Sequence, residues 1–175
     1  HFRKFRDKID TVYKRRGLLA KRSFLLGSSP GCGKSSLINK FITEIKDEEG
    51  MCIIRIDSSN IDYDGVLTAL TLSKQDKISF LILVIEDIGG TSLHERSNRV
   101  DGALLNMRDG NQDVFKVPTL VIATTNYLDL LDKTLTNRPG RFDYVYEVPP
   151  PKDSELIWLM EQFLERQMTP EEKTA

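Results

Sequence analysis

The sequence is poor in cysteine and has no long apolar run, and both shortages exclude classes of protein. Its two cysteines, Cys32 and Cys52, lack the spacing of a zinc site. We expect two reduced thiols in an intracellular protein, whose compartment (cytosol, nucleus or organelle matrix) the sequence does not distinguish. The longest apolar run, 80–85, is far too short to cross a bilayer. No signal peptide is visible, and because the chain begins at His1 rather than Met we expect a fragment of a longer protein.

Net charge is also small, but it is unevenly distributed. The formal charge is -1 over 175 residues, which favours no partner of either sign. The first 22 residues carry nine Lys and Arg against two Asp, a net +7, so the remainder carries -8. Phe2, Phe5, Ile9 and Val12 recur at helical spacing, so segment 1–16 is predicted to be a basic amphipathic helix. Its basic face is either solvated or in contact with an acidic protein, a lipid or a nucleic acid.

A glycine-rich stretch between an apolar run and a helical pattern carries the first chemical signal. It reads Gly27-Ser28-Ser29-Pro30-Gly31-Cys32-Gly33-Lys34-Ser35-Ser36. A strand, a glycine-rich turn and a helix form the context of a phosphate-binding loop, whose backbone N–H groups surround phosphate oxygens at the positive end of the helix. We expect ATP to contact the eight residues Ser29, Pro30, Gly31, Cys32, Gly33, Lys34, Ser35 and Ser36. Lys34 would meet the β- and γ-phosphates, and the Ser35 hydroxyl can ligate Mg²⁺.

One position departs from the pattern G-x-x-x-x-G-K-[ST]. The first glycine of the pattern corresponds to Ser28, and Gly27 stands one place too early. Because serine is small, we expect a tolerated substitution, with a steric effect on the loop as the alternative. The alternative to a phosphate-binding loop is an ordinary glycine-rich turn that stands by chance beside a Lys-Ser pair.

Short apolar runs alternate with helical patterns, and this order predicts a parallel α/β sheet flanked by helices. Expected strands are 22–26, 51–56, 80–85, 117–123 and 144–148. Expected helices are 37–46, 61–72, 98–107 and a last one around 156–164. Three prolines at 149–151 separate the last helix from the sheet.

Polar residues at the ends of two expected strands add to the loop. Glu86 and Asp87 follow the apolar run 80–85, and Asn126 follows the run 117–123. In open α/β sheets the carboxyl ends of strands face the ligand crevice. One carboxylate can hold the Mg²⁺ shell and the other can polarise a water, while Asn126 can contact the γ-phosphate or that water.

Two arginines lie on a rigid turn, Asn137-Arg138-Pro139-Gly140-Arg141-Phe142-Asp143. Arginine suits the charge of a transferring phosphoryl group, so Arg138 and Arg141 are candidate catalytic residues. The alternative is a surface turn held by an Arg–Asp pair.

These motifs, in this order, resemble the AAA ATPases. Asn126 together with the turn that holds Arg138 and Arg141 is similar to their second region of homology. A narrower resemblance is to the branch that contains the mitochondrial translocase of the Rieske iron–sulfur protein. It rests on segments 13–17, 101–106 and 109–110, and on the order Glu then Asp at 86 and 87, where most AAA proteins have Asp then Glu. The resemblance covers about residues 10–150.

The resemblance implies a role for each matching residue. Lys34 and Ser35 match the Walker A lysine and the Mg²⁺ hydroxyl. Asp87 matches the water-activating carboxylate of Walker B, and Glu86 lies nearer the Mg²⁺ shell. Asn126 matches the sensor of the γ-phosphate. Arg138 and Arg141 match arginine fingers that reach into a neighbouring subunit, which implies a homo-oligomeric ring.

The resemblance also implies a division of the chain and a function. We expect a basic helix at 1–16, an AAA large subdomain at 17–151, and at 152–175 about one helix of the lid domain with a frayed tail. The expected enzyme is an ATPase that uses Mg²⁺ and drives remodelling or translocation of an unidentified protein substrate. Tyr63 is a candidate pore contact, or else an ordinary half-buried aromatic residue.

Two other classes of function stay open. A nucleotide-gated scaffold with weak turnover is consistent with Ser28, the Glu86-Asp87 order and the short lid. A DNA-linked motor or loader is consistent with the basic first helix.

Overall fold

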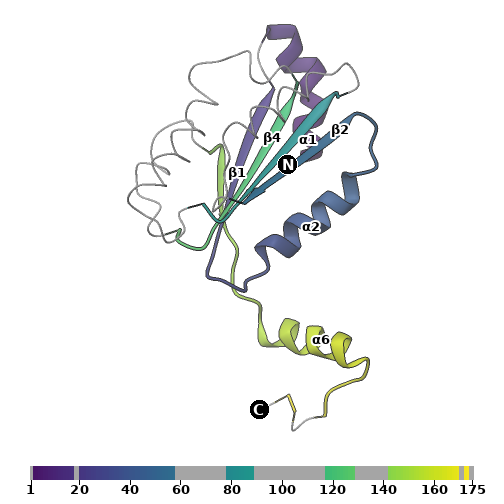
Figure 1. Cartoon of the computed structure of the whole chain (residues 1–175), viewed down its shortest axis with the longest axis vertical. Helices are drawn as coiled ribbons and strands as arrows, with labels where there is room; N and C mark the ends of the chain where they lie inside the picture. The colour runs from purple at the N-terminus through teal and green to yellow at the C-terminus, as the bar shows by residue number, and fades with distance from the viewer. Residues whose placement is uncertain are drawn as a thin grey trace.

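The computed structural model contains a five-stranded parallel sheet with the strand order β2-β3-β4-β1-β5 (Figure 1). It describes residues 2–17, 20–57, 78–88, 117–128, 142–169 and 172–173. The strands are β1 (Lys21–Gly27), β2 (Met51–Asp57), β3 (Phe80–Glu86), β4 (Thr119–Thr125) and β5 (Tyr144–Glu147). All five form close to their expected ends, and the predicted α/β class is confirmed.

The central strands are apolar throughout because the sheet buries both of its faces. In β3, Leu81 and Leu83 belong to a core cluster on one face, whereas Ile82 and Val84 belong to a second cluster on the other. Side chains alternate between the faces of a strand, so a strand covered on both sides needs an uninterrupted apolar run. The run at 80–85 therefore forms an interior strand of the sheet, between β2 and β4.

The first two helices pack on the same face of the sheet. Helix α1 (Phe2–Lys8) continues into a π-helical turn (Ile9–Tyr13) and a 3-10 turn (Lys14–Arg16), and ends at Gly17, whose φ is 63°. Its buried Phe5 and Ile9 share a core cluster with Ile38 and Ile45 of α2 (Lys34–Ile45). The amphipathic pattern predicted for both segments is thus confirmed in the packing.

Helix α6 (Asp153–Leu164) lies apart from the sheet, beyond the prolines at 149–151 (Figure 1). The Lys152 N–H donates to the Glu155 carboxylate at 2.8 Å, which stabilises the first turn. None of the residues of α6 is buried, and Phe163 is 83% exposed. The predicted last helix forms, but most of its large apolar side chains are exposed among the described residues.

The two helices expected at 61–72 and 98–107 fall outside the described residues. Among the helices that the structure does describe, none has both the length and the apolar character needed to cross a membrane.

Candidate nucleotide-binding site

The phosphate-loop sequence forms a tight turn between β1 and α2. Gly31 and Gly33 have φ values of 83° and 85°, a backbone region that favours glycine. Gly33 directly precedes α2, and its carbonyl accepts the Leu37 N–H at 2.9 Å. The N–H groups in the first turn of α2, which have no acceptor within the helix, therefore lie at the loop, where they can bind an anion.

Ser28 lies on the loop without strain, which explains why serine can replace the usual glycine there. Ser28 is not among the described non-glycine residues with positive φ, so no special backbone conformation demands glycine. The side chain is buried, and its hydroxyl accepts a hydrogen bond from Lys34 Nζ at 2.9 Å. The sequence predicted mere tolerance, whereas the structure gives this hydroxyl a partner.

Gly27 lies too close to a neighbouring side chain to carry a Cβ atom. It is the last residue of β1, and a Cβ there would lie 2.5 Å from Leu128 Cδ1. The displaced glycine of the motif thus lets the segment after β4 pack closely against the end of β1.

Lys34 is buried and is held by oxygen atoms of neutral groups. Only 8% of the residue is exposed. Its Nζ donates to the Ser28 carbonyl and hydroxyl at 2.9 Å each, to the Ser29 carbonyl at 3.1 Å and to Asn126 Oδ1 at 2.8 Å. No carboxylate of the described residues forms an ion pair with it. A buried ammonium without a countercharge favours an anionic ligand, and phosphate oxygens fit this requirement.

Asn126 joins the phosphate loop to the acidic strand end. While its Oδ1 accepts from Lys34, its Nδ2 donates to Asp87 Oδ1 at 2.8 Å. The three residues come from α2, from the end of β4 and from the end of β3. Because β4 lies between β1 and β3, the parallel register brings these ends together.

Asp87 has a constrained backbone. Its φ is 55°, a left-handed conformation that costs free energy for a residue other than glycine. The Thr124 hydroxyl accepts the Asp87 N–H at 3.0 Å, and the Thr124 carbonyl accepts the Ile88 N–H at 2.8 Å. Thr124 therefore holds the backbone at Asp87 in place, a role that the sequence did not assign to it.

Glu86 faces Ser35 on one side and a cation on the other. The Ser35 hydroxyl donates to Glu86 Oε2 at 3.2 Å, which places the two expected Mg²⁺ ligands together. Glu86 Oε1 forms an ion pair with Arg55 of β2, and Arg55 also donates to Asn39 Oδ1 at 2.6 Å. A hydroxyl and a carboxylate suit Mg²⁺, which usually keeps several waters and takes few protein ligands.

Arg55 and Asn39 were not predicted as site residues from the sequence. The available signal was a charged residue inside the otherwise apolar run 51–56. Arg55 is the cation beside Glu86, and its charge can neutralise that carboxylate.

The remaining site residues divide into two groups. Ser29, Pro30, Gly31, Cys32 and Ser36 lie on the loop and the first turn of α2, and their contact with ATP stays a prediction. Arg138, Arg141 and Tyr63 lie outside the described residues.

Comparison with known proteins gives the family. Residues 24–150 match the ATPase family associated with various cellular activities (AAA). The chain belongs to the AAA family. This AAA chain is 19% identical to a solved AAA domain of FIGL-1 in complex with ADP, with a TM-score of 0.65 over 90% of this chain and 52% of the other. That similarity shows the fold.

Curated relatives include the mitochondrial chaperone BCS1 of Homo sapiens, 31% identical over 75% of this AAA chain and 32% of its own length. A probable mitochondrial chaperone BCS1-A of Dictyostelium discoideum is 33% identical over 88% of this chain and 38% of its own. The AAA-ATPase At2g18190 of Arabidopsis thaliana is 33% identical over 75% and 28%. The narrower resemblance to the Rieske-protein translocase branch is confirmed by these relatives. The chain spans about a third of their length.

Proposed function

We propose that the chain is the catalytic module of an ATPase that hydrolyses ATP with Mg²⁺. The observation that carries the proposal is the hydrogen-bonded chain from Lys34 through Asn126 to Asp87. It links the group suited to bind phosphate with the group suited to activate water, through a residue able to contact both.

Each residue has a task in this proposal. Lys34 exchanges its bonds to Ser28, Ser29 and Asn126 for phosphate oxygens. Ser35 and Glu86 hold Mg²⁺, which would neutralise charge on the phosphates. Asp87 orients the attacking water and accepts its proton, while Asn126 holds its carboxylate and Thr124 holds its backbone.

We further propose that turnover remodels a protein substrate within a homo-oligomeric ring. Two of the relatives are named as chaperones, which supports remodelling over a passive scaffold. Their mitochondrial names support an organelle as the compartment of the parent protein. Arg138 and Arg141 are proposed to complete the site of a neighbouring subunit.

The direct test compares two lysines of α2. Lys34→Ala should abolish productive ATP binding, because it removes the buried cation of the loop. Lys40→Ala removes the same charge from an exposed position of the same helix and should leave binding unchanged. Titration with Mg·ATP, followed by phosphate release, measures both. Near-normal binding by Lys34→Ala would refute the phosphate-loop assignment.

A further inference from the structure

A second cavity lies beside the basic first helix, at the opposite end of β1 from the phosphate loop. It encloses about 120 Å³, against roughly 30 Å³ for one water in the liquid. A single small ion therefore fits inside it, whereas a nucleotide does not. Arg22, in its wall, lies five residues before Gly27 at the loop, a separation of about 16 Å along a strand. The cavity is thus distinct from the proposed ATP site.

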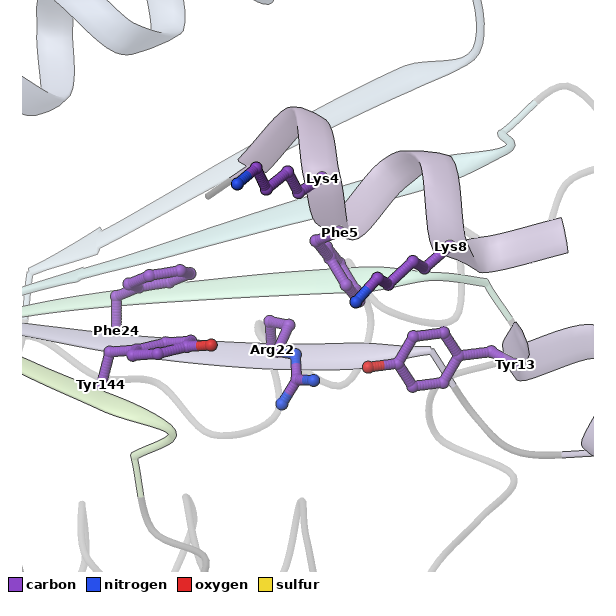
Figure 2. Close-up of a pocket in the computed structure, with 7 residues that line it drawn as sticks. All are labelled: Lys4, Phe5, Lys8, Tyr13, Arg22, Phe24 and Tyr144. Carbon is purple, nitrogen blue, oxygen red and sulfur yellow. The ribbon is translucent and has the colours of Figure 1, made fainter. Parts of the chain in front are cut away.

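Three hydrogen-bond donors from separate segments are directed into this cavity. Figure 2 shows the ammonium of Lys8, the hydroxyl of Tyr13 and the guanidinium of Arg22 pointing toward one another. They belong to α1, to the π-helical turn that follows it, and to β1. A tetrahedral oxyanion presents oxygen atoms in several directions, so donors that converge from three sides suit it better than a flat carboxylate.

Arg22 is held in position, yet part of its guanidinium is available. Its Nη1 donates to Asp143 Oδ1 at 3.0 Å, and its guanidinium carbon lies 6.0 Å from the centre of the Tyr13 ring. Burial alone would lower the pKa of Arg22, but Tyr13 and Asp143 outweigh it and the pKa is raised. The other N–H groups of Arg22 donate to no acceptor in the part of the chain that the structure describes. They can bind an oxyanion.

The wall of the cavity carries an excess of positive charge. Lys4 lies one helical turn before Lys8 and also lines the cavity, and neither lysine forms an ion pair with any of the described residues. Asp143 neutralises only one of the three cations, so three minus one leaves a net charge of +2. The nearby Asp10 pairs with Lys14 instead. This charge favours a doubly charged anion, which phosphate is at slightly alkaline pH.

We propose that this cavity binds one inorganic phosphate ion through Lys8, Tyr13 and Arg22, with Lys4 adding charge beside it. Because Lys8 belongs to α1 and Arg22 to β1, the bound ion joins the first helix to the sheet. A phosphate ester carries the same group, but its organic part exceeds the small volume. ATP hydrolysis would release this ion, although the proposal does not depend on that activity.

The test is calorimetric titration of inorganic phosphate into the 175-residue chain carrying Lys34→Ala, so that the phosphate loop contributes least. Chloride keeps the ionic strength constant. Lys8→Gln should weaken phosphate binding roughly tenfold to a hundredfold, the range for one charge-assisted hydrogen bond. The matched control, Arg3→Gln, removes the same charge from an exposed position of α1 that does not line the cavity. It should change the affinity less than about threefold.

A second variant tests the hydroxyl of Tyr13. Tyr13→Phe keeps the ring, with its contact to Arg22 and its edge contact to Phe5 at 5.7 Å between centres. The free energy of unfolding in chloride should therefore stay unchanged. Phosphate affinity should fall about twofold to tenfold, the range for one neutral hydrogen bond. A merely structural role of this hydroxyl would change the free energy of unfolding and leave the affinity as it is.

Other outcomes would overturn the proposal. Equal losses in Lys8→Gln and Arg3→Gln would show general charge attraction. Glycerol 3-phosphate that binds as tightly as inorganic phosphate would assign the cavity to phosphate esters. Phosphate binding that Lys34→Ala abolishes would belong to the phosphate loop alone. If Lys34→Ala fails to fold, the same comparison of Lys8→Gln with Arg3→Gln in the unsubstituted chain decides. Failure of the ATPase proposal would leave phosphate binding in this cavity unaffected.

Discussion

Adjacent carboxylates at the end of β3 have different surroundings, and we therefore expect them to have different roles. Asp87 is tied to Asn126, whereas Glu86 contacts Ser35 and Arg55. Asp87→Asn should therefore retain nucleotide binding and lose hydrolysis by about 10²–10⁴-fold, the usual contribution of a general base. Glu86→Gln should instead raise the Mg²⁺ concentration needed for binding.

Binding of Mg·ATP and phosphate release, measured on both variants, separate the two roles. If Glu86→Gln alone traps bound ATP, the roles are reversed. If neither substitution matters, the scaffold alternative gains support.

Arg55 is expected to compete with Mg²⁺ for Glu86. Arg55→Gln removes the guanidinium from the ion pair, so the carboxylate becomes a better ligand and half-maximal activity should need severalfold less Mg²⁺. Asn39→Ala removes only the contact that supports Arg55 and should shift the requirement less. The measurement is the rate of phosphate release against Mg²⁺ concentration at fixed ATP. If Arg55→Gln needs the same Mg²⁺ concentration for half-maximal activity as the unchanged chain, the ion pair has a structural role only.

At the scale of elements, the end of β1 depends on the close approach of Leu128. Gly27→Ala should reduce the free energy of unfolding by about 1–3 kcal/mol, because the new Cβ overlaps the leucine side chain. Leu128→Ala removes the overlapping atoms, so the double variant should be more stable than additivity predicts. Urea unfolding of the two single variants and the double variant measures this coupling. Simple additivity would show that Leu128 is not the obstacle.

Elements and motifs were predictable to different degrees. The five strands and the loop follow from local patterns, since an apolar run ending in glycine or a carboxylate needs no distant information. The partners of Glu86 and Asp87 were not predictable, because Arg55 and Thr124 reach them only through the strand order. The exposed side of α6 was not predictable either, because an amphipathic pattern does not say what covers it.

On the scale of the whole molecule, the central expectation is a site shared between subunits. Arg141→Ala should bind ATP normally but turn over about 10³–10⁵-fold more slowly, the range for loss of an arginine finger. Mixing it with Lys34→Ala subunits should restore activity, because an intact loop then meets an intact arginine across an interface.

The measurement is phosphate release from the mixture against each variant alone, at equal total protein. Mixed assembly is verified separately, for example by pull-down of differently tagged subunits. A mixture no better than the weighted mean of its parts would contradict the ring mechanism.

Helix α6 also gives the molecule a built-in optical reporter. Trp158 is the single tryptophan of the sequence, and it is 60% exposed on this helix. Tryptophan emission from this chain is therefore emission from α6 alone. A shift of that emission to shorter wavelength on adding nucleotide, a second subunit or a substrate would report that α6 has been covered, without any attached label.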